Sequence, residues 1–316
     1  MSESKQPVDH LVHRFAVATC FVALLPIGIG TVVTTLKAGM AFADWPTSDG
    51  HNMLLYPWLN DLRHTDRFTE HGHRLAGMVI GLTSIALVVI AFLREKKRWV
   101  RNYTLIILLS VIAQGLLGGA RVLMDANLLA MVHSITGALF FSLCIVFAML
   151  TGRRWSESKT VPACLSLAAS LMVLLLPLLV IVQYWMGGMF RHLGTMMFEH
   201  LVGAVVVSVS GFCCCVLLMR STSSEYNRAG KLILGALLLQ LCLGAGAWLT
   251  KLNVPALGWV ASTGSPASVI FRSSHTIGGM VLLTSSVLAA VHVGRAFSWY
   301  TVADQLQLNS SKEGLA

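Results

Sequence analysis

Long apolar runs dominate the pattern of hydrophobic and polar positions along the chain. Each contains about twenty residues, enough for a helix to cross the ~30 Å hydrocarbon core of a bilayer. Backbone hydrogen bonds in lipid must be made within the segment, so the runs predict helices. Eight are expected, at residues 14–36, 72–93, 102–121, 128–150, 161–185, 198–219, 231–250 and 273–296. The pattern therefore predicts an all-α integral membrane protein.

Positive charge is unevenly distributed between the runs. Basic clusters follow the second, fourth and sixth runs, at 94–101 (REKKRWVR), 152–159 (GRRWSESK) and 220–231, whereas the intervening loops carry far fewer basic residues. The positive-inside rule therefore predicts that both termini are cytoplasmic. This asymmetry accounts for the net charge of +9, so no nucleic-acid partner is expected. No small-residue cleavage site follows the first run, which favours a retained helix over a signal peptide.

Composition supports the membrane class and excludes a disulfide framework. Only 12% of residues are charged, against roughly 25% in soluble domains, and the mean hydropathy is +0.72. All seven cysteines fall inside predicted helices. The run Cys213–Cys215 cannot converge on one metal ion, because consecutive helical side chains point about 100° apart. These cysteines are interpreted as small apolar packing residues.

The second half of the chain repeats motifs of the first. The matching segments are Gln114–Ala120 with Gln240–Ala247, His133–Leu139 with His275–Val281 and, more weakly, His73–Gly77 with His200–Ala204. Two pseudo-repeated four-helix bundles with the same orientation are therefore expected. The expected organisation is a cytoplasmic tail at 1–13, a first unit at 14–151 with an outer loop at 37–71, a linker at 152–160, a second unit at 161–296 and a cytoplasmic tail at 297–316.

Four of the eleven histidines occupy repeat-equivalent positions near the outer ends of even-numbered helices, namely His73, His133, His200 and His275. A lone histidine there is more often an interfacial residue. Two per bundle at matched depth favour two bis-histidine haem sites. Each unit offers too few other ligands for a zinc or di-iron site. Glycines that follow each histidine leave room for a macrocycle or allow close helix packing; these are Gly77, Gly137, Gly203 and Gly279.

Two features are confined to the first half. Glu70 lies three residues before His73 and shares its helix face, whereas Glu199, directly before His200, cannot take that position. Glu70 is interpreted as a functional carboxylate beside the cofactor, or as an interfacial acid that caps the helix. The long aromatic loop at 37–58 also has no counterpart and is expected to cover a pocket. His71 competes with His73 as the ligand, although it points to nearly the opposite face.

This ordered set of motifs resembles the haem A synthases over residues 14–296. The shared features are the two four-helix halves, Glu-x-x-His-Arg at Glu70–Arg74, Gln-Gly-x-x-Gly-Gly at Gln114–Gly119, the histidines His133, His200 and His275, and AGMAFADWP at 38–46. Some bacterial members have a cysteine pair in the first outer loop that is linked to activity. This loop has none, so a mechanism that needs that disulfide is excluded.

The resemblance implies an oxidoreductase that converts the C8 methyl group of haem O to a formyl group, giving haem A for terminal oxidases. Substrate haem would lie between His73 and His133, and a haem b cofactor between His200 and His275 would relay electrons. Glu70 matches the glutamate considered essential in the family, acting in proton transfer or charge stabilisation. Further candidate haem contacts are Arg74, Gln114 and Gln240.

The resemblance also implies a multi-pass protein of the bacterial inner (cytoplasmic) membrane, with its haem sites toward the outer side. Candidate partners are membrane lipid, haem O synthase, an electron donor or acceptor, and a second copy of the chain.

Two other functions remain open from the sequence. A non-catalytic di-haem b-type electron carrier would use the same histidine pairs, but a symmetric carrier would not need Glu70 or the one-sided loop. A transporter with parallel repeats would need helices broken at mid-membrane. Only Pro26 and Pro177, at corresponding places in the first and fifth helices, are candidates for such breaks.

Overall fold

The computed structural model describes residues 7–157, 165–251 and 264–313, and no strand occurs among them. Eight helices are long and apolar enough to cross a membrane, which confirms the predicted all-α membrane class. They are α1 (His10–Thr35), α2 (Thr65–Arg94), α3 (Arg98–Leu123), α4 (Asn127–Thr151), α6 (Leu167–Leu193), α7 (Met197–Met219), α8 (Ser224–Leu249) and α9 (Pro266–Glu313). Two short helices, η1 (Trp58–Asp61) and α5 (Arg153–Glu157), lie between them.

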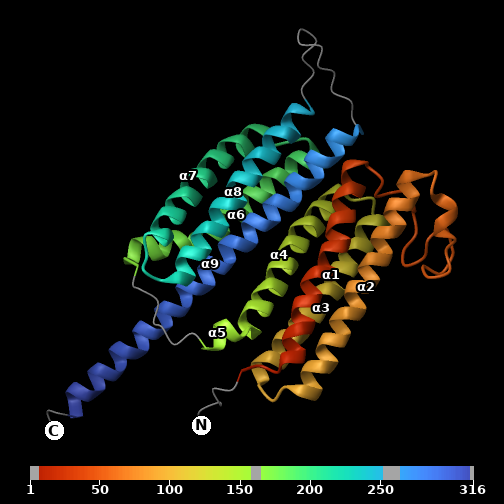
Figure 1. Cartoon of the computed structure of the whole chain (residues 1–316). Helices are drawn as coiled ribbons and strands as arrows, with labels where there is room; N and C mark the ends of the chain where they lie inside the picture. Colours follow the sequence, from red (N-terminus) through yellow and green to blue (C-terminus); the bar gives the residue numbers. More distant parts are fainter. Residues whose placement is uncertain (1–6, 158–164, 252–263, 314–316) are drawn as a thin grey trace.

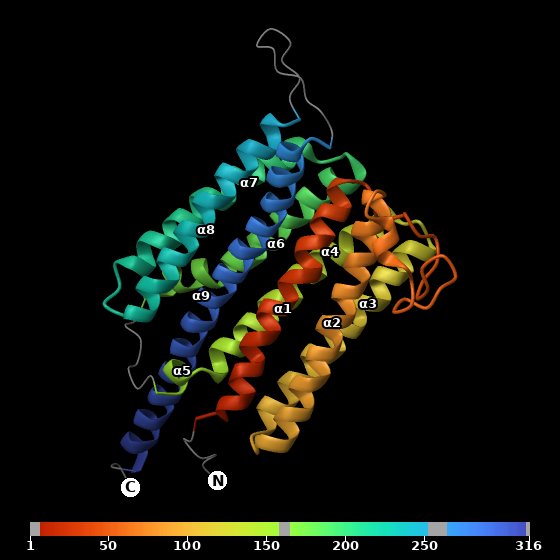
Figure 2. The same cartoon turned by 45° about the vertical axis from the view of Figure 1, so that its right-hand side comes forward.

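The membrane helices form two groups of four (Figures 1 and 2). In the first group each helix packs against the next and α1 packs against α4, and α6–α9 follow the same order of neighbours. The groups meet where α1 and α4 face α6 and α9. The start of α1 and the end of α9 lie at the same end of the molecule (Figure 1). This arrangement is the one expected for two four-helix units. The internal repeat and the cytoplasmic location of both termini stay predictions.

Several helices extend beyond the apolar runs. α2 begins at Thr65 rather than at 72, so residues 65–71 belong to the helix and not to the outer loop. α6 ends at Leu193 rather than at 185, where Gly194 adopts a positive φ of 72°. α9 continues to Glu313 through most of the expected tail, because no glycine or proline occurs between 296 and 313. Hydropathy marks the membrane core, whereas a helix continues until a residue ends it. The expected helix start at 161, and Cys164, lie outside the described residues.

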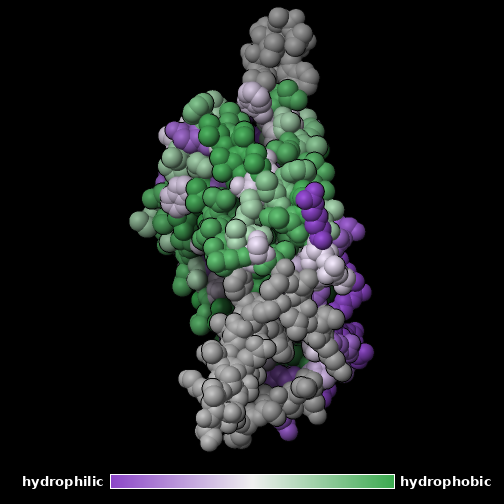
Figure 3. Space-filling view, turned by 90° about the vertical axis from the view of Figure 1, so that its left-hand side faces the viewer, coloured by the Kyte–Doolittle hydropathy of each residue, from purple (hydrophilic) through white to green (hydrophobic). Residues whose placement is uncertain are grey.

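The outward faces of the helices are apolar. On the side where α7 lies, hydrophobic residues cover much of the described surface (Figure 3). On α7 itself the exposed side chains include Phe198, Val205, Val209 and Phe212. A helix that is apolar on its outer face is stable in lipid and not in water.

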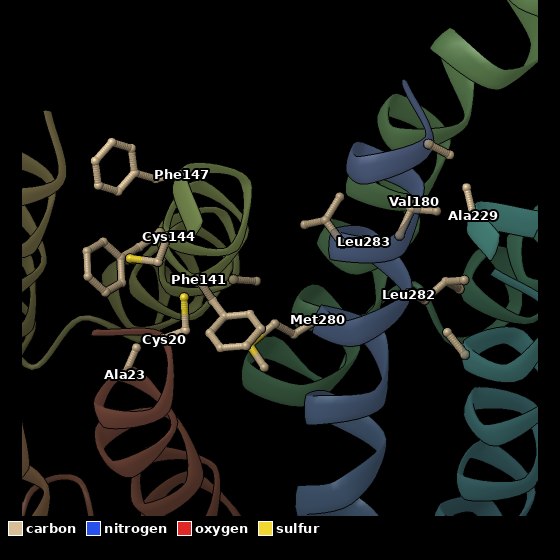
Figure 4. Close-up of a cluster of buried hydrophobic side chains, with 14 of the residues drawn as sticks. Cys20, Ala23, Phe141, Cys144, Phe147, Val180, Ala229, Met280, Leu282 and Leu283 are labelled. Atoms are coloured by element: carbon tan, nitrogen blue, oxygen red, sulfur yellow. The ribbon is translucent and has the colours of Figure 1, made fainter. Parts of the chain in front are cut away.

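A continuous apolar core joins the two groups. Figure 4 shows side chains from α1, α4, α6, α8 and α9 gathered in it, including Phe147 and Leu283, which are 0% and 1% exposed. Buried hydroxyl pairs cross the same contact, as between Ser142 on α4 and Thr284 on α9 at 2.9 Å. The described cysteines are free, and Cys214 and Cys215 are buried among apolar residues.

We expect Leu283→Ala to lower the free energy of unfolding by about 2 kcal/mol or more, because it leaves a cavity where the two groups meet. Leu82→Ala on α2 is the matched control, since Leu82 is 65% exposed and faces away from the core. Thermal unfolding of the detergent-solubilised protein measures both variants. Equal losses would show that the contact between the groups does not contribute to stability.

Candidate functional site

The segment expected at the mouth of the second helix lies inside α2. Asp66 is in the first turn of α2, where an acid suits the positive end of the helix dipole. Glu70, His73 and Arg74 follow in the second and third turns, and Glu70 and Arg74 are buried. Glu70 is therefore not an interfacial cap, and the loop before α2 covers these polar residues.

The structure brings His73 on α2 and His133 on α4 together. Their ring centroids are 6.2 Å apart, and the ring planes are nearly perpendicular at 88°. Imidazole nitrogens bind metals at about 2.0 Å, so two rings on opposite sides of one iron have centroids roughly 6 Å apart. The pair thus has the spacing of axial ligands.

His200 on α7 and His275 on α9 form a second pair with almost the same geometry. Their centroids are 6.3 Å apart and the rings are inclined at 83°. Among the described residues, no group of three or more His, Cys, Asp or Glu could hold a metal ion. The donor set therefore fits a metal whose remaining ligands come from a macrocycle.

A glycine on the preceding helix makes room for each imidazole. A Cβ atom there would lie 2.8–3.2 Å from the Cε1 atom of the ring, in the pairs Gly30–His73, Gly118–His133, Gly187–His200 and Gly244–His275. These contacts were not anticipated from the sequence. The signal was present for two of them, because Gly118 and Gly244 end the shared Gln-x-x-Leu-Gly motif.

Each histidine is also contacted by a backbone group one helical turn before its glycine. The pairs are Pro26 with His73, Gln114 with His133, Gln183 with His200 and Gln240 with His275. The clearest contact joins Nδ1 of His73 to the carbonyl of Pro26 at 2.9 Å. A carbonyl oxygen only accepts, so Nδ1 carries the proton and Nε2 is left as the metal-binding atom. At His275 the contact lacks regular hydrogen-bond geometry, and Nδ1 has no partner.

Pro26 and Pro177 do not occupy equivalent places, because Gln183 takes the position of Pro26 in the second group. Both prolines lie inside continuous helices, α1 and α6. The helices are thus not interrupted at these prolines as a transporter site of broken helices would require.

The glutamine side chains hold histidines more than they face a ligand. The Gln114 amide, with its nitrogen toward His133, lies 3.2 Å from both Nδ1 and the carbonyl oxygen of His133. The Gln183 amide lies 3.0 Å from Nδ1 of His200. The Gln240 amide packs against Gly278 and Gly279, and its oxygen has no hydrogen-bond partner.

A cavity of about 650 Å³ adjoins the first histidine pair. Its wall includes His73, His133, Glu70 and Gly77, and no heavy atom outside its own stretch of helix lies within 4 Å of a Cβ placed on Gly77. The other group of helices also contributes to the wall, through Tyr184, Arg191, Thr276 and Met280. The volume falls in the range of small-molecule and cofactor sites.

Glu70 ties the outer loop to α2. One oxygen accepts a hydrogen bond from Arg74 at 2.7 Å, and the other accepts from the backbone N–H of Ala41 at 2.7 Å and of Phe42 at 3.4 Å. Only 2% of Glu70 is exposed. The carboxylate lines the cavity, but both of its oxygens are already hydrogen-bonded.

Arg74 also binds the outer loop through hydrogen bonds. Its Nη1 donates to the carbonyl oxygens of Asp44 at 2.8 Å and Thr47 at 2.7 Å. Within the loop, burial acts to raise the pKa of Asp44, but hydrogen bonds from Thr47, Gly50 and Asp49 outweigh it and lower the pKa to about 2. The loop at 37–58, called the roof from here on, is therefore folded over the cavity and is bound to α2 through the buried Glu70–Arg74 ion pair.

Aromatic residues complete the roof and enclose His71. The ring of His71 lies 4.8 Å from that of Tyr56, and its Nδ1 is 3.1 Å from the hydroxyl of Ser48. Trp45 packs directly on Gly119 of α3. His71 therefore belongs to the roof, and His73 is the residue that faces His133.

Known proteins are similar in sequence to part of this chain. Residues 13–197 match the family model of the COX15-CtaA cytochrome oxidase assembly proteins. The haem A synthases of Brucella ovis and Brucella abortus (strain S19) are 26% identical over 163 residues, which cover 49% of this chain and 43% of each relative. That of Brucella anthropi is 25% identical over 169 residues.

The match to these relatives spans less than half of their own length, at 43%. The family model ends at residue 197, before His200 and His275, so it includes the first histidine pair and not the second. It nevertheless covers more than half of the 316 residues. The chain therefore belongs to the COX15-CtaA family of cytochrome oxidase assembly proteins.

Proposed function

We propose that this protein is a haem A synthase, an oxidoreductase that converts the C8 methyl group of haem O to a formyl group. The observation that carries this proposal is the asymmetry between two equal histidine pairs. Both pairs have ligand spacing, and among the described residues, which leave out 252–263 before α9, only the first pair is covered by a roof anchored on a buried Glu70–Arg74 pair. An electron carrier needs two haem sites and no roof, whereas an oxidation at a substrate benefits from exclusion of water.

In this proposal His73 and His133 hold haem O, and bound iron supplies the oxidative chemistry. The carbonyl of Pro26 fixes the tautomer of His73, and Gln114 orients His133. Gly30 on α1 and Gly118 on α3 leave the space that the Cε1 edges of the His73 and His133 rings occupy. These contacts orient the substrate before reaction, which lowers the entropic part of the barrier.

Glu70 acts in this proposal through the roof as well as through its charge. Its hydrogen bonds to Ala41 and Phe42 hold the loop over the cavity. Its negative charge is balanced by Arg74 at 2.7 Å, so it lies on the cavity wall as half of an ion pair. Proton transfer by Glu70 would require the carboxylate to exchange one of these hydrogen bonds for the substrate.

His200 and His275 hold a haem b that relays electrons in the same proposal. Support comes from the wall of the first cavity, which includes Thr276, the neighbour of His275, and Tyr184, the neighbour of Gln183. Residues next in sequence to His275 and to Gln183 thus line the first cavity, and this shared wall supports electron transfer between the two proposed sites.

The proposed location is the bacterial inner membrane with the roof on the outer side. The basic segment 94–101 lies at the opposite end of α2 from the roof, where the positive-inside rule places the cytoplasm. Proposed partners are haem O, an electron donor or acceptor and haem O synthase.

Glu70→Gln should reduce haem A formation by about a hundredfold, because the roof loses its charged anchor above the substrate. The measurement is haem extraction and chromatography after co-expression with a haem O synthase in a host that lacks haem A. Glu199→Gln is the matched control, since Glu199 is exposed and directly precedes a proposed ligand of the other pair. Wild type that makes neither haem A nor a hydroxylated intermediate would favour the electron carrier instead.

His275→Ala should remove a low-spin haem b spectrum from the purified protein, because one axial nitrogen is lost. His10→Ala, which removes an exposed imidazole at the other end of the molecule, should leave the spectrum unchanged. Absorption spectra of the reduced proteins test this. An unaltered spectrum in His275→Ala would rule out the second site.

Gly244→Ala should weaken haem b binding by about tenfold or more, because the new Cβ would lie 2.9 Å from Cε1 of His275 and displace the ring. Gly235→Ala on the same helix is the control, because nothing lies within 4 Å of a Cβ there. Haem titration followed in the Soret band compares them. Equal affinities would show that the glycine does not position the ligand.

A further inference from the structure

The cavity beside the first histidine pair carries more positive than negative charge. Its charged wall residues are Glu70, Arg74, Arg121 and Arg191. The Glu70 carboxylate pairs with Arg74 at 2.7 Å, and no ion pair among the described residues involves Arg121 or Arg191. The segment 252–263 contains no aspartate or glutamate that could supply one. Two guanidinium groups therefore face the cavity without a carboxylate in ion-pair contact. Glu70 is near enough for its charge to act on Arg121, but its hydrogen bonds go to Arg74 and to the loop.

The two arginines differ in how far their donors are used. Arg191 donates from Nη1 and Nη2 to several acceptors on α1 and α9, among them the carbonyl oxygen of Thr31 at 2.8 Å and that of Arg272 at 3.1 Å. Arg121 makes one described hydrogen bond, from Nη2 to the carbonyl oxygen of Gly39 at 2.8 Å. A guanidinium has five N–H donors, so most donors of Arg121 are left for a ligand.

The position of Arg121 on α3 relates it to the proposed substrate. Gln114, Gly118 and Arg121 are spaced by four and three residues, so they share one helix face. Gln114 holds His133 and Gly118 makes room for its ring. Arg121 continues this face by one turn toward the roof, where Gly39 contacts its guanidinium. A group bound at His133 would thus have Arg121 at its outer edge.

Arg74 was a candidate haem contact from the sequence, but its charge and its donors are engaged by Glu70 and the roof. Cations that are taken out of water without an anion are costly, and planar guanidinium groups bind carboxylates in pairs of hydrogen bonds. An iron porphyrin such as haem carries two propionate carboxylates, which would balance the two unpaired cations.

We propose that Arg121 binds a carboxylate of the porphyrin held between His73 and His133, with Arg191 supplying the second positive charge. This inference rests on the proposed function, because it takes an iron porphyrin as the ligand of this cavity. Arg121 thereby fixes which edge of the macrocycle faces the roof and which edge lies deeper in the membrane.

The test is a Soret-band titration of the purified full-length protein with hemin and with hemin dimethyl ester, in which both carboxylates are blocked. The first-site signal is the low-spin component lost in His73→Ala. Wild type should bind hemin at that site about tenfold or more tightly than the ester, and Arg121→Met should remove most of this preference. Arg121→Lys should restore part of it, because the charge returns without the planar donor pair.

Two controls separate this effect from misfolding. The second histidine pair in the same sample should bind hemin equally in wild type and Arg121→Met. Arg98→Met changes an exposed arginine at the other end of α3 and should keep the preference. If Arg121→Met does not fold, Arg121→Gln allows the same comparison.

An equal preference for hemin over the ester in wild type and in the folded Arg121 variant would overturn the inference alone, as would no preference in wild type. Absence of any low-spin component that depends on His73 would overturn the proposed function, and this inference with it.

Discussion

An imidazole inside a helix bundle needs room for its ring and a partner for its second nitrogen, and this requirement organises the protein. In each of the four cases the room comes from the helix that precedes the histidine in the chain, and for His73, His133 and His200 the partner of Nδ1 comes from that helix too. A glycine leaves the space, and the residue one turn earlier presents its backbone to the ring. The helix pairs α1–α2, α3–α4, α6–α7 and α8–α9 must therefore pack closely where the histidines lie. Short loops join α3 to α4 and α6 to α7, whereas longer segments precede α2 and α9.

The folded loop before α2 separates the two halves chemically. Where the second half has an exposed Glu199 before its histidine, the first has a buried Glu70 one helical turn before it. Burying a carboxylate is costly unless it is paired and hydrogen-bonded. Arg74 and two backbone N–H groups of the loop satisfy Glu70, so a charge that would destabilise the helix alone becomes the anchor of a folded roof. The cost of the buried ion pair is consistent with a site whose geometry matters more than its stability.

Contact between the halves gives the first cavity part of its wall. Arg191 of α6 donates to α1 and α9 at once, and Tyr184 lines the cavity from the same helix. Neither half would form this cavity by itself. The second group of helices therefore completes the wall of the cavity beside the first histidine pair.

The sequence by itself determined the eight membrane helices, because lipid requires each apolar segment to satisfy its own backbone hydrogen bonds. It also identified the four histidines and singled out Glu70, since these polar residues recur, or fail to recur, at fixed places in apolar segments. It misplaced the start of α2 and the end of α6, because hydropathy reports the membrane core and not the signals that end a helix. It left His71 and His73 as competitors, since only the folded loop shows that His71 is surrounded by Tyr56 and Ser48.

Only the tertiary structure decided which charges are paired. Glu70 and Arg74 are four residues apart, and helical spacing permits their contact, but their bonds to the loop join segments some thirty residues away. That no described carboxylate forms an ion pair with Arg121 depends on every segment that surrounds the cavity. Local pattern fixes the helices and the depth of their polar residues, whereas charge balance inside a cavity is a property of the whole packed bundle.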